Sequence, residues 1–371
     1  MIILHTITRG FGGGTMKALD QSIQYERSLG HVVWVCSGTM RPFDSSYIHI
    51  SSLRREISFL SDLRAFFELR SVIRRINPDV IHSHESKAGV LTRLMSPMFK
   101  SAVFVHTVHM ATFHSHRNSL IERIYSLIEE KMAKRTDVLL FVSSGLQNIY
   151  ALRNIRPKSL AMTIHSRISI DSFRNRIPNK FEDEEYVKSE LDIPASSKII
   201  LCVGLLEPRK RPALVLEQLS DILKVEESYN LLYLGEGPLQ EVLEESVKKL
   251  GLSHKVHFAG FKEDIERWVS ASDILVLASK FEGFPQIALQ AASLGIPTVA
   301  VRLEEYGSTR LMRFIEEGEA MASQVKSLIE SGDRLTEIDS QDELLNWNTQ
   351  SIDACHSELL ETLAQLRRIK P

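Results

Sequence analysis

The sequence predicts an α/β protein made of two doubly wound parallel sheets. Short apolar runs alternate with helical segments along the first half of the 371 residues, and the alternation restarts after a polar stretch at 174–198. Alternating strands and helices are typical of parallel sheets, because each parallel pairing needs a crossover connection. The length is also sufficient for two domains with separate hydrophobic cores.

The first series of elements follows from the apolar runs and the amphipathic segments between them. These runs are short and rich in branched side chains, as buried parallel strands are. We expect them to form one domain over 1–175. The expected strands are 2–7, 32–36, 80–82, 102–108 and 138–142, and the expected helices are 16–29, 60–76, 86–95, 119–133 and 144–152.

The second series predicts another doubly wound domain over 176–350. Its expected strands are 199–204, 229–234, 256–258, 274–278 and 298–301, with helices between them. The last segment, 347–368, is expected to be one amphipathic helix, and we treat 351–371 as a separate terminal helix. Its apolar residues recur at spacings of three to four, as on one helix face; they are Ile352, Cys355, Leu359, Leu363 and Leu366.

Composition excludes several classes of protein. The 45 basic and 47 acidic residues give a formal net charge of −2, so a nucleic-acid partner is not expected. Cys36 and Cys202 lie in apolar runs and are interpreted as buried small side chains rather than disulfide partners. The amino terminus enters a strand directly and no apolar run approaches ~20 residues, which favours a cytoplasmic protein without a signal peptide or membrane span.

The most informative stretch is 281–300. Glu282 and Gly283 follow an apolar strand, and Pro285 stands where a helix prefers to begin. Gly295 ends that helix before the next strand. An acidic side chain is therefore expected at the carboxyl end of a strand, beside a helix amino terminus. Doubly wound folds bind phosphorylated ligands at such places.

A glycine-rich loop at 9–15 follows the first strand and contains Gly12 and Gly13. Glycine lets a ligand approach the backbone closely, although three consecutive glycines also suit a plain tight turn. The loop lacks the full dinucleotide fingerprint, and no acidic residue closes the next strand. A nicotinamide-dependent enzyme is therefore not expected.

Three consecutive cations, Arg209, Lys210 and Arg211, follow the first strand of the second series. Loop cations are commonly just solvated, but lysine and arginine at a strand end also neutralise phosphates. Because Glu282 occupies the same kind of position in the same half of the chain, we interpret this loop as a diphosphate-binding element.

Several histidines lie near the ends of expected strands. His109 follows strand 102–108 and is a candidate for contact with a sugar hydroxyl, whereas His106 is expected in the sheet and His114 in a loop. His82 and His84 share a strand face and could chelate a metal ion. No third ligand stands at a useful spacing in the sequence, so they are interpreted as lining a cleft and no metal site is expected. The apolar and basic loop 95–100 is a candidate for contact with a bilayer surface.

Taken together, these residues resemble the retaining, nucleotide-sugar-dependent glycosyltransferases of the family 4 type, which have the GT-B fold and build bacterial surface glycans. The resemblance covers about residues 1–300 and returns at the helix near Trp347. Its most specific part, from Glu282 to Pro297, is similar to the family signature of two glutamates separated by seven residues. Supporting matches are Gly12-Gly13, Asp79 to Gly89, Thr107 to His109, Val203-Gly204 with Lys210, Gly235 to Pro238 and Phe258 to Gly260.

The resemblance implies two Rossmann-like domains, the first binding an acceptor glycan or lipid-linked glycan and the second a nucleotide sugar, with the terminal helix crossing back to the first domain. It implies a catalytic role for His109 at the transferred sugar, for Glu282 at the donor sugar and for Lys210 at the diphosphate. No metal or other cofactor is implied. Donor-binding residues by the same resemblance are Gly12, Gly13, Arg209, Gly283, Phe284, Pro285, Gln286 and Gln290.

The sequence departs from the family pattern at several positions. The second glutamate is Gln290, whose neutral oxygen still accepts hydrogen bonds, at a cost of ~1 kcal/mol in donor affinity. Leu205 replaces a phosphate-binding arginine, and Met110 replaces a glycine. One strand is expected to be missing beyond Ala300. These differences keep open a non-catalytic homologue that binds a nucleotide sugar or a partner enzyme, and a nucleotide-sugar epimerase.

Overall fold

The computed structural model describes residues 1–371 except 9–13, 41–43, 55, 112, 114–118, 167–169, 171–172, 174, 177–179, 308, 310 and 333–348. The chain divides into two compact units, each with its own parallel sheet. Unit 1 comprises Met1–Ile168, Glu304–Gly307 and Thr349–Pro371, and unit 2 comprises Ser169–Leu303 and Ser308–Asn348. The predicted α/β class with two doubly wound sheets is confirmed.

Unit 1 is built on a seven-stranded parallel sheet in the order β3-β2-β1-β4-β5-β6-β7. The structure adds β3 and β7, which the apolar pattern did not predict. Both are short strands at the edges of the sheet, where half-exposed side chains weaken the pattern. The strands are β1 (Ile2–Ile7), β2 (Val32–Ser37), β3 (Tyr47–His49), β4 (Val80–His84), β5 (Val103–Val108), β6 (Val138–Phe141) and β7 (Leu160–Thr163).

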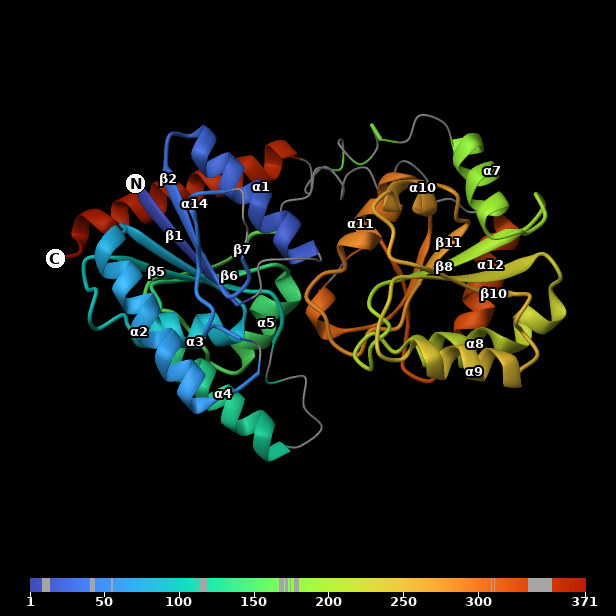
Figure 1. Ribbon diagram of the computed structural model, residues 1–371, viewed down its shortest axis with the longest axis horizontal. Coiled ribbons are helices and arrows are strands. Elements are labelled where there is room, and N and C mark those ends of the chain that lie inside the picture. Colours follow the sequence, from blue (N-terminus) through green and yellow to red (C-terminus); the bar gives the residue numbers. More distant parts are fainter. Residues whose placement is uncertain are drawn as a thin grey trace. The chain divides into compact units, whose positions relative to one another are not determined.

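Helices cover both faces of this sheet. Helices α1 and α14 lie on one face, and helices α2 and α3 lie on the other (Figure 1). Cys36 is buried on the second of these faces, as predicted. The helices are α1 (Gly14–Ser28), α2 (Phe59–Ile76), α3 (Ser86–Leu94), α4 (Ser119–Ala133), α5 (Ser144–Leu152), the 3-10 turn η2 (Glu304–Tyr306) and α14 (Thr349–Ile369).

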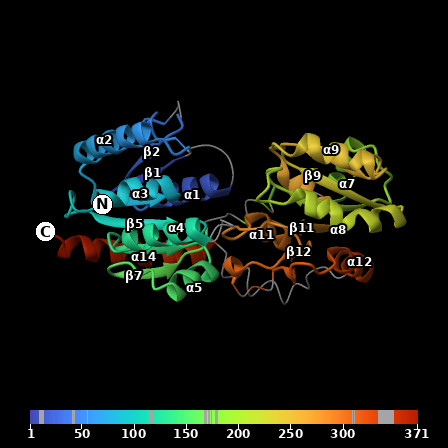
Figure 2. The same ribbon diagram turned by 90° about the horizontal axis from the view of Figure 1, so that it is seen from below.

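Two segments from late in the chain complete unit 1. Helix α14 contacts β5 (Figure 2), and Leu359 and Leu363 are buried in the core beneath it. The hydroxyl of Tyr25 on α1 donates to the carbonyl of Asp353 at 3.0 Å. The turn η2 packs on α5 so closely that a Cβ atom at Gly145 would lie 2.1 Å from a backbone oxygen, which explains the glycine there.

Unit 2 is built on a six-stranded parallel sheet in the order β10-β9-β8-β11-β12-β13. Its strands are β8 (Lys198–Val203), β9 (Tyr229–Leu234), β10 (Val256–Gly260), β11 (Ile274–Leu277), β12 (Thr298–Val301) and β13 (Arg313–Ile315). Side chains of α8, α9 and α12 form a large core on one face. The helices are α7 (Lys180–Glu190), α8 (Pro212–Val225), α9 (Gln240–Lys249), α10 (Ile265–Ser270), α11 (Gln286–Ser293) and α12 (Met321–Ser331).

The prediction that one strand is missing beyond Ala300 is wrong. Strand β13 pairs in parallel with β12, and Val299 lies opposite Arg313. The strand has three residues and lies at the edge of the sheet, and Arg313 is exposed. So short a run with a charged first residue gives little periodicity in the sequence. The second sheet is therefore more complete than the sequence indicated.

Each sheet has one position where its connections reverse direction. In unit 2 the chain leaves β8 toward β9 and β10, and then returns to the other side of β8 at β11. In unit 1 the equivalent reversal lies between β1 and β4. The loops that follow the two strands of such a pair diverge, which opens a place for a ligand at the carboxyl edge.

Candidate functional site

Lys210 and Glu282 meet at the switch point of the second sheet. Lys210 follows β8 and Glu282 follows β11, and these two strands are hydrogen-bonded neighbours. The Lys210 ammonium donates to Oε1 of Glu282 and forms an ion pair with it. Ser279 Oγ donates to the other carboxylate oxygen at 2.8 Å. Both charged side chains are only 16% exposed, so the pair is largely shielded from water.

Burial and charge act on the Glu282 carboxyl in opposite directions. Burial alone raises its pKa, because the charged form loses hydration. The Lys210 charge, the hydrogen bonds from Lys210 and Ser279, and the Arg209 charge together outweigh burial and lower the pKa below 4.5. Glu282 is therefore a carboxylate at neutral pH, with an acceptor role rather than an acid role.

Arg209 lies between the two loops of this site. Its guanidinium pairs with Glu207 at 2.7 Å and donates to the Phe281 carbonyl at 3.4 Å. The Lys280 amide donates to the Arg209 carbonyl at 2.8 Å. With 27% of its side chain exposed, Arg209 is positioned to contact a ligand at this edge.

Arg211 makes different contacts from Arg209 and Lys210. Its guanidinium donates to the carbonyls of Ala278 and Ser279, at 2.6 and 3.3 Å, and pairs with Glu317 at 2.6 Å. It therefore fixes the backbone that leads to Glu282 rather than facing a phosphate. Of the three consecutive cations, only Lys210 contacts the Glu282 carboxylate directly among the interactions of the described residues.

The amino end of α11 supports the same site. Gln286 is the first residue of this helix and Pro285 precedes it with φ −74°, the value that suits a helix start. The positive end of the helix dipole thus lies next to the Glu282 loop. Gly283 is buried, Phe284 is half-buried, and Gln290 lies on the second turn of α11, where it is half-buried.

The structure describes all three residues that depart from the family pattern. Gln290 takes its place on α11 without disturbing the helix. Leu205 is 54% exposed, so an apolar side chain points into solvent where an arginine was expected. Met110 is half-buried after β5. Gly12, Gly13, His114 and Trp347 lie outside the described residues.

The loop that carries Lys210 depends on close backbone packing. Gly204 directly follows β8, and its amide donates to the carbonyl of Leu234 at the end of β9. Gly235 has φ +137°, and a Cβ atom there would lie 2.2 Å from the Gly204 oxygen. Only glycine fits that position. The predicted Gly235-Glu-Gly-Pro238 match thus has a structural cause next to the site.

His109 lies in unit 1, half-buried after β5, whereas Lys210 and Glu282 belong to unit 2. Burial lowers the pKa of His109 to about 4, so its imidazole is neutral at pH 7. Its Nε2 lies 3.3 Å from Nδ1 of His84. His109 is thus a hydrogen-bonding group rather than a cation.

The structure brings a third histidine beside His82 and His84, although none stands at a useful spacing in the sequence. His5 on β1 lies beside them, and ring nitrogens of the three lie within 4.8 Å of one another. His5 is paired in register with His82, since β1 and β4 are neighbours at the switch point. Burial and neighbouring histidines lower the pKa of both His82 and His84 well below 6.5. Spacing along the sequence could not reveal this, because His5 comes from a distant strand.

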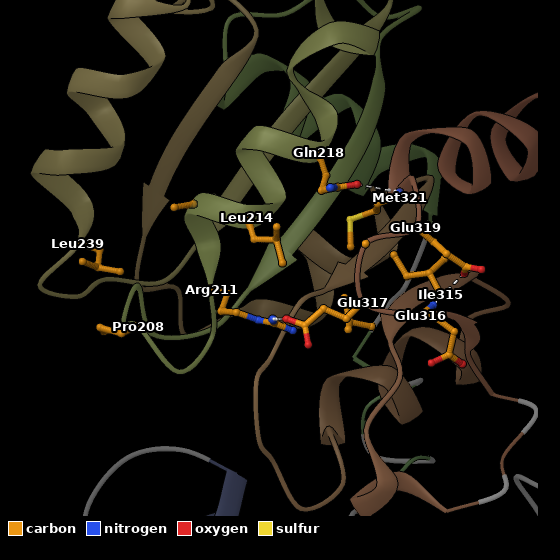
Figure 3. A pocket seen from close by; sticks show the side chains of 13 residues that line it. Pro208, Arg211, Leu214, Gln218, Leu239, Ile315, Glu316, Glu317, Glu319 and Met321 are labelled. Atoms are coloured by element: carbon orange, nitrogen blue, oxygen red, sulfur yellow. Dashed lines mark hydrogen bonds and ion pairs between the residues drawn. The ribbon is translucent and has the colours of Figure 1, made fainter. Parts of the chain in front are cut away.

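A cavity of about 450 Å³ lies in unit 2 (Figure 3), and neither Lys210 nor Glu282 is among its described lining residues. It is bounded by the start of α8 and by the segment between β13 and α12. Gln218 accepts a hydrogen bond from the Met321 amide at 3.1 Å, which caps α12 beside the cavity (Figure 3). Arg211 is the only one of the three loop cations among its described lining residues, so this cavity is distinct from the Lys210–Glu282 site.

Both units match known protein families. The family described as Glycosyltransferase Family 4 matches residues 12–166, and the family described as Glycosyl transferases group 1 matches residues 183–338. The chain belongs to glycosyltransferase family 4. The resemblance inferred from the Glu282 and Lys210 motifs is thereby confirmed.

Curated relatives of this family 4 chain include proteins named as glycosyltransferases. It is 26% identical over 254 residues to the Escherichia coli UDP-Gal:alpha-D-GlcNAc-diphosphoundecaprenol alpha-1,3-galactosyltransferase, covering 67% of this chain and 64% of that protein. It is 24% identical over 270 residues to the Bacillus subtilis putative glycosyltransferase EpsD, covering 72% and 69%. The match thus spans slightly less than two thirds of the first relative.

Solved structures confirm the GT-B architecture of this family 4 chain. Anabaena HepE in complex with UDP-glucose has a TM-score of 0.79 at 18% identity, covering 98% of this chain and all of that one. WaaG, a glycosyltransferase involved in lipopolysaccharide biosynthesis, has a TM-score of 0.73 at 14% identity, covering 97% and 99%. At these identities the likeness concerns the fold alone.

Proposed function

We propose that this chain is a retaining glycosyltransferase that transfers a sugar from a UDP-sugar to a glycan or lipid-linked glycan in surface-polysaccharide synthesis. The observation that carries the proposal is the Lys210–Glu282 pair at the switch point of the second sheet, in a chain of family 4. The UDP-galactose named for the E. coli relative and the UDP-glucose bound to HepE support the donor class.

The chemistry of the proposed reaction suits this site. Transfer passes through a state in which the sugar resembles an oxocarbenium ion and the nucleoside diphosphate carries developing negative charge. Lys210, Arg209 and the amino end of α11 provide fixed positive charge for that leaving group. Because protein cations do this work, we propose that transfer needs no added divalent ion and no other cofactor.

Glu282 and Lys210 have complementary roles in this proposal. The Glu282 carboxylate accepts hydrogen bonds from donor-sugar hydroxyls, and it holds Lys210 in place before the donor binds. A diphosphate then takes the ammonium as its partner. The backbone of Gly283 to Gln286 lies at the helix start beside the diphosphate, and the Gln290 amide oxygen accepts from a ribose hydroxyl. Gly12 and Gly13 let the donor approach the first domain.

His109 is proposed to contact the transferred sugar. Its neutral imidazole can donate one hydrogen bond and accept another, which suits a sugar hydroxyl or a carbonyl better than a phosphate. The low pKa that burial gives this ring keeps it neutral through the physiological range.

We further propose that unit 1 contacts the inner face of a membrane, where a lipid-linked acceptor lies. Within the described residues, no helix combines the length and apolar character that crossing a bilayer requires. Helices α2 and α4 both contact α3, and each exposes an apolar stripe. Of the loop predicted to touch a bilayer, Met95 is buried and Met98 is 52% exposed. The exposed stripes are Phe59, Leu60, Leu63 and Phe67 on α2 and Leu120, Ile121, Ile124 and Leu127 on α4.

The donor proposal is tested by thermal unfolding of the pure full chain with UDP, GDP, TDP and their sugar conjugates, without added metal. A ligand at one hundred times its dissociation constant stabilises by about 2.7 kcal/mol. We expect a shift with UDP and UDP-sugars only. Absence of a shift with every nucleotide would favour the non-catalytic homologue, and conversion of a nucleotide sugar without an acceptor would favour an epimerase.

A further inference from the structure

Three histidines converge at the switch point of the first sheet. His5 on β1 and His82 and His84 on β4 point to the same sheet face, because His5 and His82 are paired in register and His84 is two residues further along. All three are buried, at 0%, 7% and 4% exposure. The other inward residues of this face form a hydrophobic core, so three adjacent imidazoles there are unusual and need polar partners.

The ring nitrogens are close enough for one ion. His5 Nδ1 and His84 Nε2 are 3.0 Å apart, and the three ligand atoms lie within 4.8 Å of one another. A tetrahedral zinc ion with bonds of about 2.0–2.1 Å needs its nitrogen ligands about 3.3 Å apart. One pair is thus already near that spacing, and the third nitrogen has to move closer when all three bind one ion.

We propose that His5, His82 and His84 bind one divalent transition-metal ion, with zinc as the reference case. Three imidazoles favour zinc, cobalt, nickel or copper over magnesium and calcium, which prefer oxygen ligands. All three ligands belong to unit 1, whereas Lys210 and Glu282 belong to unit 2. The ion is therefore an addition to the donor chemistry proposed above and does not replace it.

Each of the three rings also has a partner for its other nitrogen. His5 Nε2 lies 2.9 Å from a Glu26 carboxylate oxygen, and His82 Nε2 lies 2.7 Å from Thr107 Oγ1. His84 Nδ1 lies 3.3 Å from His109 Nε2. Metal-binding histidines almost always have such a partner, which fixes the tautomer and leaves the second nitrogen for the ion. Because Nε2 of His82 is bonded to Thr107, Nδ1 is the nitrogen of His82 that would bind the ion.

Glu26 adds negative charge beside the proposed ion. This buried carboxylate on α1 bonds His5 through one oxygen and His356 of α14 through the other, at 2.9 and 3.2 Å. A carboxylate–histidine–metal chain of this kind raises the basicity of the ligand nitrogen. Helices α1 and α14 thus both contribute to the surroundings of the site.

A small cavity gives the ion a free coordination position. About 60 Å³ of space is lined by the three histidines together with His109, His165 and His356. That volume exceeds the ~10–15 Å³ that one water molecule needs, and histidines line the cavity together with apolar side chains. Three protein ligands plus water is the open arrangement of catalytic zinc sites, as opposed to a closed structural site.

The test uses the tag-free full chain, stripped with a chelator and titrated with Zn²⁺ by calorimetry, with bound metal counted by mass spectrometry. We expect one ion per chain, and Co²⁺ should give the visible spectrum of a four-coordinate site. His5→Ala, His82→Ala and His84→Ala should each weaken binding at least tenfold. His49→Ala and His254→Ala, which remove exposed histidines elsewhere, should leave the zinc affinity unchanged.

Two subtler variants guard against loss of folding. Glu26→Gln and Thr107→Val keep the side-chain volumes but change the partners of His5 and His82, and each should weaken zinc binding about 10- to 100-fold. Zinc should also raise the melting temperature of the wild type and not that of the ligand variants. A folded wild type that binds no Zn²⁺ at one equivalent, or ligand variants that bind it equally well, would overturn the proposal. The histidines would then be a hydrogen-bonded chain only.

Discussion

Lys210 and Glu282 neutralise each other in the structure, yet the proposed reaction needs both as separate charges. We predict that Lys210→Ala and Glu282→Ala each lower transfer at least tenfold. Lys210→Ala removes the cation that stabilises the departing diphosphate, and Glu282→Ala removes the acceptor for the donor sugar and leaves Lys210 unpaired. The measurement is initial rate at saturating acceptor, with donor concentration varied.

A matched control exists on the surface of unit 2. Lys249 and Glu245 form an ion pair on α9 at 3.8 Å, with 79% and 70% of their side chains exposed. Lys249→Ala and Glu245→Ala should leave the rate unchanged, because exposed pairs contribute little to stability. Near-normal turnover in either site variant, with an intact fold, would contradict the assigned roles.

The lowered pKa of Glu282 predicts a dependence of stability on pH. A carboxyl whose pKa is depressed in the folded state stabilises the protein at pH values above its unfolded pKa, and the contribution is lost as the pH falls through the folded pKa. Relative to Glu282→Gln, the wild type should therefore keep a constant advantage in melting temperature near neutral pH and lose it below 4.5. A difference that grows on acidification would contradict the Lys210–Glu282 pairing.

A substitution at Gln290 is expected to increase the affinity for UDP. Gln290 stands on the second turn of α11, where it is half-buried. Gln290→Glu should strengthen UDP binding by about 1 kcal/mol, roughly fivefold in Kd, because a charged acceptor bonds the ribose hydroxyls more strongly. Calorimetric titration with UDP measures the change. Weaker binding would place the ribose elsewhere.

The sequence predicted where single residues lie relative to the strands better than it predicted which other side chains they contact. Glu282 and Lys210 were found because each follows an apolar strand, and their contact follows once β8 and β11 are neighbours. His5 was missed because its neighbours come from β4, which is distant in sequence and adjacent only at the switch point. The separate role of Arg211 was equally hidden, since it depends on carbonyls of another loop.

At the level of elements, helices α2 and α4 carry the prediction for membrane contact. Leu60 and Leu63 are 78% and 45% exposed on α2, so replacing them should not disturb the core. Leu60→Glu with Leu63→Glu should lower the affinity for anionic lipid vesicles about tenfold or more, since inserted leucines contribute about 1.5–3 kcal/mol each. Co-sedimentation with vesicles measures this.

The control for this prediction is an exposed apolar residue of unit 2. Val242 on α9 is 59% exposed, and Val242→Glu introduces the same charge away from α2 and α4. Vesicle binding should be unchanged in this variant. Equal loss of binding in both proteins would indicate a general charge effect, and no loss in either would refute contact through α2.

Element prediction failed mainly at the edges of the sheets. The central strands β1, β4, β8 and β11 lie inside their sheets and consist largely of buried residues, so their pattern is strong. Strands β3, β7 and β13 lie at sheet edges with exposed or half-exposed side chains, and their hydrogen bonds to a neighbour define them more than their composition does. Helix α7 lies within the polar stretch that suggested a domain boundary.

At the level of the whole molecule, the two proposed ligands should act on different units. Lys210, Glu282 and Gln290 belong to unit 2, and His5, His82 and His84 belong to unit 1. In hydrogen exchange of the full chain, UDP should slow exchange in peptides that cover 204–211 and 278–290. Zinc should slow exchange in peptides that cover 2–7 and 80–84.

This experiment separates the two proposals. Protection by UDP without protection by zinc would support the donor site and reject the metal site. Protection by zinc alone would do the reverse. A zinc effect confined to unit 2 would also reject the metal site as proposed, because none of the three histidines lies there.

Unit 1 is built from parts of the chain that lie both before and after most of unit 2 in the sequence. The last of these parts contains α14, which covers one face of the unit 1 sheet. The ribosome makes residues 349–371 after every residue of unit 2. The later unit can therefore complete its core first, while Ile3, Ile7 and their neighbours still lack the leucines of α14. That face of the sheet is then covered by α1 alone until α14 has left the ribosome, so its apolar surface is most exposed before the chain is released.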